Sequence, residues 1–246
     1  MLQTVFITGA SGGIGLAVAR RFAQNGDALF LHYFSNREPL DQLQAEFPDV
    51  PMQFAQADLA QISEQDRLAE EAWNWRGGIQ SVIQTAGVDI LTGERKKWTF
   101  EQKLTALWNV DVQASMRIAR NAAQKISAAG QKGTILLIGW DAVDWGMAGD
   151  SAQLFAAAKG AVTAFARSLA QGVGPNVRVN VLAPGWIQTE WGKQAPAAWQ
   201  KHAKKDSLLD RWGTPQEVAD AAFFLCSENA AFLNGIVLPV DGGKRF

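Results

Sequence analysis

The sequence predicts an α/β protein built on a doubly wound, seven-stranded parallel sheet with helices on both faces. Short apolar runs alternate along the chain with longer segments of helical period, which is the pattern of successive β–α–β units. No linker, repeat or low-complexity segment interrupts this alternation, and 246 residues suffice for a compact domain with a sizeable core. We therefore expect a single domain over residues 1–246.

Strands are predicted where short apolar runs are rich in β-branched and aromatic residues. They cover, in order, residues 4–8, 28–34, 52–56, 81–85, 134–139, 177–183 and 236–240. The segments between them predict helices at residues 13–25, 38–46, 62–75, 99–128, 152–173 and 215–227. The fourth helix has a capping-box spacing at Thr99 and Gln102, and Gly77-Gly78 is expected to end the third.

Composition narrows the class of protein. The net charge of −1 argues against nucleic acid as a main partner. No apolar run approaches the ~20 residues of a membrane span, and the amino terminus enters a strand without a basic segment, so neither a membrane partner nor a signal peptide is expected. The single cysteine, Cys226, excludes an internal disulfide and is expected in the core. We expect a cytoplasmic protein.

A glycine-rich loop, TGASGGIG, follows the first predicted strand and leads into the first predicted helix. Glycines let a backbone turn tightly and approach a pyrophosphate, whose charge then meets the helix amino terminus. Many such loops are only turns, and the spacing differs from the GxGxxG fingerprint. Its position in the first β–α–β unit favours nucleotide binding.

Five motifs in order resemble the short-chain dehydrogenase/reductase family. They are TGASGGIG, the Ala86-Gly87 pair after the fourth strand, FAAAK at 155–159, RVNVLAPGWIQT at 178–189, and RWGTPQEVADAAFFL followed by NGIVLPVDGG. The similarity covers essentially the whole chain and extends to reductases of the 3-oxoacyl-acyl-carrier-protein type. It implies a Rossmann-type fold, a nicotinamide cofactor and an oxidoreductase activity on carbonyls or alcohols.

Cofactor choice can be argued from the end of the second strand. An acidic residue about 20 residues beyond the loop would bind both ribose hydroxyls and select NAD. Tyr33 stands there instead, no carboxylate precedes Glu38, and Ser35, Asn36 and Arg37 follow as donors for a 2′-phosphate. We therefore expect NADP rather than NAD. The alternative is that Arg37 is a solvated turn residue.

The resemblance also implies a set of cofactor-binding residues. Asp58 would face the adenine, Ala86 and Gly87 would line the cofactor, and Thr189 would hold the nicotinamide amide. The full set is Gly9, Ser11, Gly13, Ile14, Gly15, Tyr33, Asn36, Arg37, Asp58, Leu59, Ala86, Gly87, Lys159, Pro184, Gly185, Ile187 and Thr189.

The catalytic positions depart from the family. Its members use a tyrosine acid, a serine that holds the substrate oxygen, a lysine that binds ribose, and an asparagine. Matching by position keeps only Lys159: the tyrosine becomes Phe155, the serine Trp140 (Gly139 or Asp141 if the register slips by one), and the asparagine Asp111. An asparagine pair after the fourth strand is replaced by Gln84-Thr85.

Two repairs are open for the missing acid. Asp141 or Asp111 could donate the proton, its pKa raised by apolar neighbours, or the substrate could be one that needs no acid, such as an iminium or activated alkene. Asp141 could equally be a loop carboxylate. Ser151, one turn before Phe155, could supply a hydroxyl or be a helix N-cap. The single tyrosine, Tyr33, is expected at the adenosine end.

Several loop residues border the expected cleft. Trp140, Trp145, Trp186 and Trp191, with Trp98 beside them, could stack on a flat or cationic substrate or simply fill space. A basic run at 93–98 could attract an anion or be solvated, and by resemblance residues 190–207 form a mobile lid. The helices at 99–128 and 152–173 resemble the surfaces through which relatives form tetramers, so a homo-oligomer, dimer or tetramer, is expected.

Three functions therefore remain open. The leading hypothesis is an NADP(H)-dependent oxidoreductase whose atypical site lacks the tyrosine and serine. The second is a regulatory or scaffold protein that binds the cofactor without catalysis, and the third is a non-redox enzyme that reuses the pocket. No cluster of cysteine, histidine and carboxylate has metal-ligand spacing, so no metal is expected.

Overall fold

The computed structural model describes residues 2–245, except the side chain of Trp191. It contains one parallel sheet in the order β3-β2-β1-β4-β5-β6-β7. The strands are β1 (Thr4–Thr8), β2 (Ala28–Tyr33), β3 (Met52–Gln56), β4 (Ser81–Gln84), β5 (Gly133–Ile138), β6 (Val177–Pro184) and β7 (Val237–Val240). The seven-stranded sheet predicted from the alternating pattern is confirmed.

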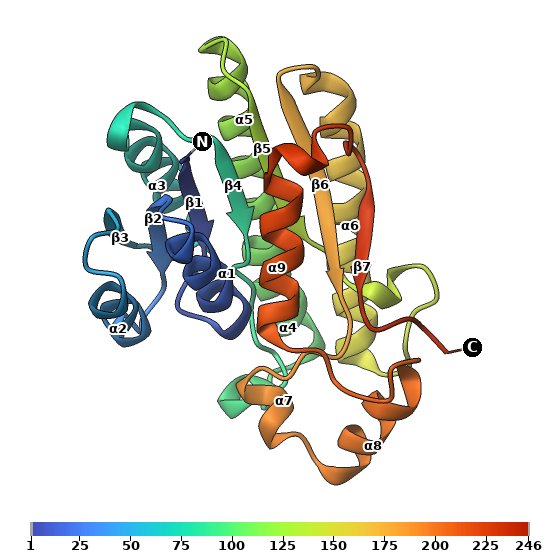
Figure 1. The fold of residues 1–246 in the computed structure, drawn as a ribbon. Coiled ribbons are helices and arrows are strands. Elements are labelled where there is room, and N and C mark those ends of the chain that lie inside the picture. Colours follow the sequence, from blue (N-terminus) through green and yellow to red (C-terminus); the bar gives the residue numbers. More distant parts are fainter. Residues whose placement is uncertain (1, 246) are drawn as a thin grey trace.

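Helices cover both faces of the sheet (Figure 1). On one face lie α1 (Gly13–Gln24), α2 (Glu38–Glu46) and α9 (Pro215–Cys226); on the other lie α3 (Ile62–Asn74), α4 (Phe100–Leu107), α5 (Ser115–Ala128) and α6 (Asp150–Val173). Two short helices, α7 (Glu190–Gln194) and α8 (Ala197–Asp206), lie below the carboxyl ends of the strands in Figure 1.

The sheet separates two hydrophobic cores, and β1 shows why. Its residues alternate between the faces: Val5 and Ile7 pack with α1, α2 and α9, whereas Phe6 packs with α3, α5 and α6. Because both faces are covered, all five residues of the strand are buried, as is typical of parallel sheets. Cys226 is buried as expected, in the core on the α1 side.

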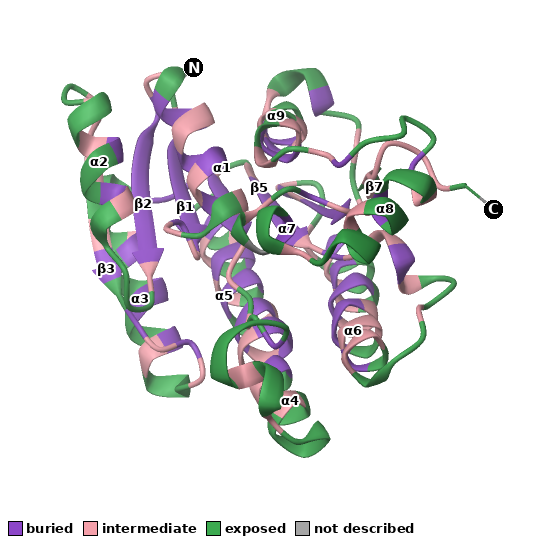
Figure 2. Cartoon of the chain, turned by 90° about the horizontal axis from the view of Figure 1, so that it is seen from below, coloured by how far each residue is buried: buried purple, intermediate pink, exposed green. Residues whose placement is uncertain are grey.

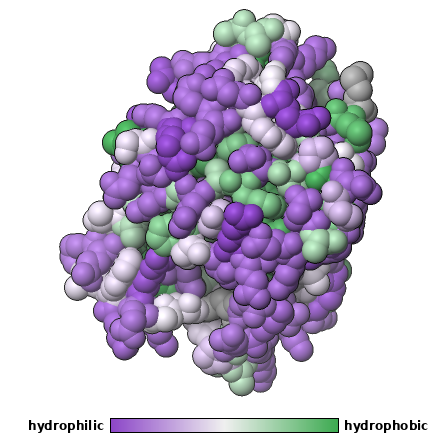
Figure 3. Space-filling view, turned by 90° about the vertical axis from the view of Figure 1, so that its left-hand side faces the viewer, coloured by the Kyte–Doolittle hydropathy of each residue, from purple (hydrophilic) through white to green (hydrophobic). Residues whose placement is uncertain are grey.

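The edge strand β3 is only partly covered, and its burial alternates. Figure 3 shows this side of the molecule, where apolar side chains lie within a largely hydrophilic surface. The partly buried Phe54 of this strand has the guanidinium of Arg37 4.8 Å from its ring centre. An arginine over an exposed aromatic face covers apolar surface while its charge stays in water.

The predicted helix at residues 99–128 is not α-helical throughout. Between α4 and α5 the backbone forms a π-helical segment, Trp108–Ala114, which widens the turn by one residue. The capping box at the start of α4 is confirmed. The Thr99 hydroxyl accepts from the Gln102 amide, and the Gln102 side chain accepts from the Thr99 amide. The positive φ of Gly77 and Gly78, 79° and 125°, confirms the turn after α3.

The interpretation of Ser151 as an N-cap is wrong. Helix α6 begins at Asp150, and its N-cap is Gly149, whose φ of 106° suits glycine. Ser151 therefore lies inside the first turn, where its hydroxyl accepts a 3.4 Å hydrogen bond from the Lys103 ammonium.

Candidate active site

The predicted site residues collect at the carboxyl edge of the sheet, which Figure 2 views from below. The strand order reverses direction between β1 and β4, and open α/β sheets bind ligands at such a point. The glycine-rich loop leaves β1 there, and Thr85, Ala86 and Gly87 leave β4 beside it.

The glycine-rich loop fits its neighbours too closely for side chains. A Cβ atom on Gly9, whose φ is +67°, would lie 2.7 Å from the backbone of Ala86, and one on Gly15 would collide with the Gly9 carbonyl. A Cβ on Gly13 would come within 3.2 Å of Thr189, which brings the loop after β6 over the start of α1. Ser11 and Ile14 lie on this same loop and first turn.

Helix α1 begins after Gly12, which has no side chain to cap it. The amides of a first turn without a cap can bind an anion, and the helix dipole favours negative charge there. This arrangement fits the diphosphate of a dinucleotide.

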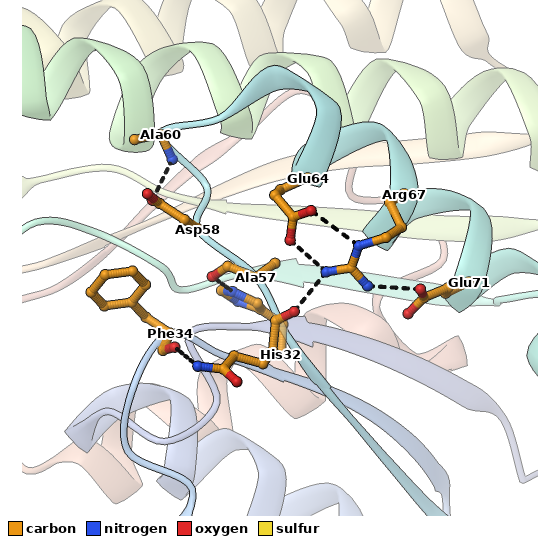
Figure 4. Close-up of polar contacts among 9 residues, drawn as sticks. His32, Phe34, Ala57, Asp58, Ala60, Glu64, Arg67 and Glu71 are labelled. Carbon is orange, nitrogen blue, oxygen red and sulfur yellow. Dashed lines mark hydrogen bonds and ion pairs between the residues drawn. The ribbon is translucent and has the colours of Figure 1, made fainter.

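A cavity of about 270 Å³ lies where β2 and β3 end, lined by Phe34, Gln56, Ala57, Asp58 and Glu64. Figure 4 shows its polar contacts. The Asp58 carboxylate accepts a 2.9 Å hydrogen bond from the Ala60 amide, which fixes the turn after β3. Arg67 of α3 donates to the Gln56 carbonyl at 2.7 Å and forms an ion pair with Glu64. It thus holds two residues that line the cavity. Leu59, predicted with Asp58, is buried.

His32 was assigned no role by the sequence, yet it joins the loop to this cavity. Its Nδ1 accepts a 3.0 Å hydrogen bond from the Gly9 amide. Its Nε2 lies 3.1 Å from the Ala57 carbonyl, a contact that Figure 4 shows. Burial lowers the pKa of His32 to about 4, so the ring is neutral at physiological pH. A neutral ring that accepts at Nδ1 must donate from Nε2. The available signal was a histidine inside an apolar strand, which needs partners.

The expected 2′-phosphate donors lie where β2 ends and α2 begins. Tyr33 ends β2, Asn36 accepts a hydrogen bond from the Glu38 amide, and Arg37 is the N-cap residue of α2. The Arg37 guanidinium is half-exposed and bound to Asp41 at 2.9 Å. An exposed pair of this kind exchanges readily with water or another anion.

Near the end of β5, the aromatic pair of Trp140 and Phe155 lies beside the buried Lys159. The rings of Trp140 and Phe155 meet edge to face, with centroids 5.5 Å apart and an interplanar angle of 77°. The Lys159 ammonium lies 5.4 Å from the centre of the Phe155 ring. The structure thus brings Trp140, Phe155 and Lys159 together, as the family match implies.

Lys159 has a charged partner that the sequence did not assign to it. Its ammonium lies 2.9 Å from Asp111 Oδ1, and the two side chains are only 6% and 1% exposed. Asp111 Oδ2 accepts a 2.9 Å hydrogen bond from the Val88 amide, whereas Oδ1 makes no hydrogen bond within the described chain, so the contact with lysine is an ion pair. The π-helical segment carries Asp111 into this position.

Asp141 lies in a short turn after β5, and its carboxylate lies beside Gly185 in the loop after β6. A Cβ on Gly185 would come 3.1 Å from Asp141 Oδ2 and 2.8 Å from the Cβ of Asp241. Burial raises the pKa of Asp141 to about 6, Lys244 opposes the rise, and the charges of Asp241 and Asp206 add to it. An acid with this pKa carries a proton over part of the physiological range.

Aromatic residues hold the segment that the sequence assigned to a lid. Trp186 packs against Trp199, His202 and Trp212 with ring centroids 5.5 to 5.7 Å apart. The Trp186 indole donates a 3.0 Å hydrogen bond to Asp206 at the end of α8. These tryptophans pack on one another, and Trp145 has the Lys244 ammonium 5.8 Å from its ring. The Trp191 side chain lies outside the described residues.

The remaining predicted positions lie outside the contacts described above. Lys97 pairs with Glu94 at 2.9 Å in an exposed turn, and Arg95 lies over Trp98, as solvated residues do. Pro184 ends β6, and Ile187 packs into the core on the α1 side. Within residues 2–245 no three histidine, cysteine or carboxylate side chains group as a metal site would. No helix in that range is long and apolar enough to cross a membrane.

Fold and site together define a dinucleotide-binding α/β protein, and comparisons with known proteins agree. A family model described as Enoyl-(Acyl carrier protein) reductase matches residues 9–245. The 3-oxoacyl-acyl-carrier-protein reductase MabA of Mycobacterium tuberculosis is 30% identical over 242 residues, 98% of this chain and 92% of that protein. The uncharacterized oxidoreductase YmfI of Bacillus subtilis is 30% identical over 255 residues, 99% of each chain.

The fold has close structural counterparts. A short-chain dehydrogenase/reductase from Brucella melitensis superposes with a TM-score of 0.86 at 26% identity, covering 99% of this chain and 97% of that one. A Serratia marcescens enzyme of the same description gives a TM-score of 0.87 at 23% identity. The chain belongs to the short-chain dehydrogenase/reductase family of NAD(P)-binding oxidoreductases.

Proposed function

We propose that the protein is an NADP(H)-dependent oxidoreductase that exchanges hydride with a small substrate without a tyrosine acid. The observation that carries this proposal is the pairing of buried Lys159 with Asp111 beneath the Phe155 ring. A lysine that stays buried and oriented can still bind ribose hydroxyls, while the ring beside it has no proton to give. When bound, the reduced nicotinamide supplies the hydride.

The preference for NADP rests on the end of β2. Tyr33 occupies the position where a carboxylate would repel a 2′-phosphate, and the exposed Arg37 guanidinium lies four residues on. Arginine binds phosphate with two parallel hydrogen bonds. Because Asp41 already holds one side of Arg37, binding of the phosphate would exchange one anion for another.

Asp141 is the proton donor in this proposal. In the reduction of a carbonyl, Asp141 would give its proton to the substrate oxygen as negative charge develops there, which would leave a carboxylate at Asp141. Its pKa of about 6, raised first by burial, supports a proton available near neutral pH. Asp111 has a different role, because its carboxylate is held by Lys159 and by the Val88 amide. It orients the lysine.

The first experiment is a fluorescence titration of the protein with NADPH and NADH, followed by turnover with ketones, enones and a preformed iminium. The proposal expects tighter binding of NADPH, loss of that preference in Arg37→Ala, and NADPH oxidation with at least one acceptor. Asp141→Asn should slow the ketones and spare the iminium, which needs no proton. Arg120→Ala, on the exposed side of α5, serves as the control. Binding of neither cofactor would overturn the proposal.

A second candidate function is cofactor binding without catalysis, as in a regulatory or scaffold protein. The edge-to-face contact between Trp140 and Phe155 favours it, since these rings fill space where relatives keep polar groups. Tight NADPH binding with no consumption over the whole acceptor panel would support this function against the first. Turnover of a substrate without net change of the cofactor would instead support a non-redox enzyme.

We also propose a cytoplasmic homo-oligomer, a dimer or a tetramer. Phe100, Leu104 and Trp108 repeat every four residues along α4 and its continuation and are 41%, 40% and 49% exposed. A stripe of large apolar side chains on one helix face is typical of an interface. Leu104→Glu should therefore shift the mass in solution toward the monomer, whereas Lys132→Glu, in the loop before β5, should not.

A further inference from the structure

We propose that His32 is a positioning residue of the cofactor site. It fixes the glycine-rich loop relative to the cavity that Ala57 and Asp58 line. The inference rests on the cofactor use proposed above. It concerns a buried histidine of β2 that makes three polar contacts to the loop and to Ala57 at the carboxyl edge of the sheet, two by its ring and one by its own carbonyl.

Two consecutive amides of the loop bind this one residue. The Gly9 amide donates to the His32 ring at 3.0 Å, and the Ala10 amide donates to the His32 carbonyl at 2.8 Å. The loop therefore starts from a point fixed by β2 as well as by β1. Only the first of the two contacts depends on the identity of the side chain.

The other side of the ring reaches the cavity. Nε2 donates to the Ala57 carbonyl at 3.1 Å, and the Ala57 amide donates in turn to the Tyr33 carbonyl at 3.2 Å. Ala57 lines the cavity and precedes Asp58, which the family match assigns to the adenine. One imidazole thus joins the segment that would hold the diphosphate to the segment that would hold the base.

The arrangement requires an imidazole in one protonation state. His32 is 2% exposed, and burial together with the charge of Arg67 disfavours the cation. In the neutral ring both nitrogens are used, one as acceptor and one as donor. Because a second proton would remove the acceptor for Gly9, the ring acts as a fixed spacer and not as a proton carrier.

Three substitutions separate the two contacts. In His32→Asn the carboxamide oxygen can stand where Nδ1 stood and accept from Gly9, but the side chain is too short to reach Ala57. In His32→Gln the amide reaches the Nε2 position and keeps the bond to Ala57. His32→Phe keeps the ring volume and loses both contacts. The control is Leu29→Ala, a buried residue of the same strand near its amino end.

The measurements are dissociation constants by calorimetry for NADPH and for 2′-phospho-ADP-ribose, which lacks the nicotinamide. We expect His32→Phe to weaken both by the same factor, about tenfold, because the partly buried Gly9 amide is left without an acceptor. His32→Asn should recover most of this loss and His32→Gln less. Leu29→Ala should lower the denaturation midpoint without changing either constant. Nitrogen NMR of the ring should find Nε2 protonated and Nδ1 unprotonated.

Two results would overturn the inference. One is unchanged affinity in His32→Phe while the wild type binds NADPH, which would refute this role and leave the oxidoreductase proposal standing. The other is a loss in His32→Phe that Leu29→Ala reproduces at equal loss of stability, which would make His32 an ordinary core residue. A wild type that binds neither cofactor would refute both proposals together.

Discussion

Phe155 retains an aromatic ring one turn before Lys159 but has no hydroxyl. The ring packs on Trp140 and lies 5.4 Å from the lysine ammonium, so a hydroxyl added to it would share the site with the buried ion pair of Lys159 and Asp111. A positioned acid typically supplies ~10²–10⁴-fold in rate.

We therefore expect Phe155→Tyr to raise the turnover of simple ketones by up to about 10²-fold. NADPH oxidation over a ketone panel measures it. Phe155→Leu, which adds no hydroxyl, is the matched control. The removal of Trp140 bulk in the double variant Phe155→Tyr/Trp140→Ser should increase the gain. No increase in turnover in either variant would mean that the bound ketone does not place its carbonyl near residue 155.

Asp141 gives a second prediction, on pH. Ketone reduction should fall tenfold per pH unit above about 6, because only the protonated carboxyl donates. The folded protein holds this proton more tightly than the unfolded chain, so the associated stability is full below about pH 4 and is lost as pH rises through about 6.

The free energy of unfolding of Asp141→Asn should thus exceed that of the wild type progressively from pH 4 to pH 8, by at most about 3 kcal/mol. Urea denaturation at several pH values measures it. Asp144→Asn, three residues on and exposed, is the control. A constant difference across this range would refute the assigned pKa.

The pair of Asp111 and Lys159 leads to a third prediction. Asp111→Leu leaves a buried ammonium without its counter-charge, which should destabilise the protein by about 3–5 kcal/mol. Asp111→Leu/Lys159→Met removes both charges and should recover most of this loss. Chemical denaturation compares the two variants. Equal stability of Asp111→Leu and the wild type would show that Lys159 reaches solvent when the carboxylate is removed.

At the scale of the element, the π-helical segment has consequences for prediction and for the site. Residues 99–128 read as one helix because a single widened turn hardly alters the apolar period over thirty residues. What selects the wider turn is tertiary: Asp111 must be buried against Lys159, and its carboxylate must reach the Val88 amide. Side-chain partners of this kind are not encoded in local periodicity.

The helices α7 and α8 were also missed, because they are short and have little apolar pattern of their own. Packing of Trp199 and His202 on Trp186 holds α8 in place. Trp199→Ala should therefore speed tryptic cleavage within residues 190–206 several-fold, with Trp73→Ala on α3 as the control. Equal cleavage rates in Trp199→Ala and the wild type would mean that the contacts of Asp206 suffice to hold α8 in place.

For the whole molecule, the sequence predicted the architecture well because both sheet faces are covered. A strand such as β1 is then buried throughout, apolar at its three central residues and easily located, and the order of family motifs follows the order of strands. The close packing of the loop between β1 and α1 was also predictable, since glycines at Gly9 and Gly15 leave a visible pattern. The links between elements, such as the one made by His32, appear only in three dimensions.

The ion pair of Asp206 and Lys244 links helix α8 to Asp141, the proposed acid. Asp206 ends α8, pairs with Lys244 and helps to raise the pKa of Asp141, while Lys244 lowers it. If α8 swings outward it carries Asp206 away and leaves Lys244 free to stabilise the Asp141 carboxylate. In that case the position of α8 and the proton affinity of Asp141 would be thermodynamically linked: the position seen here would favour the protonated acid, and protonation would favour this position of α8.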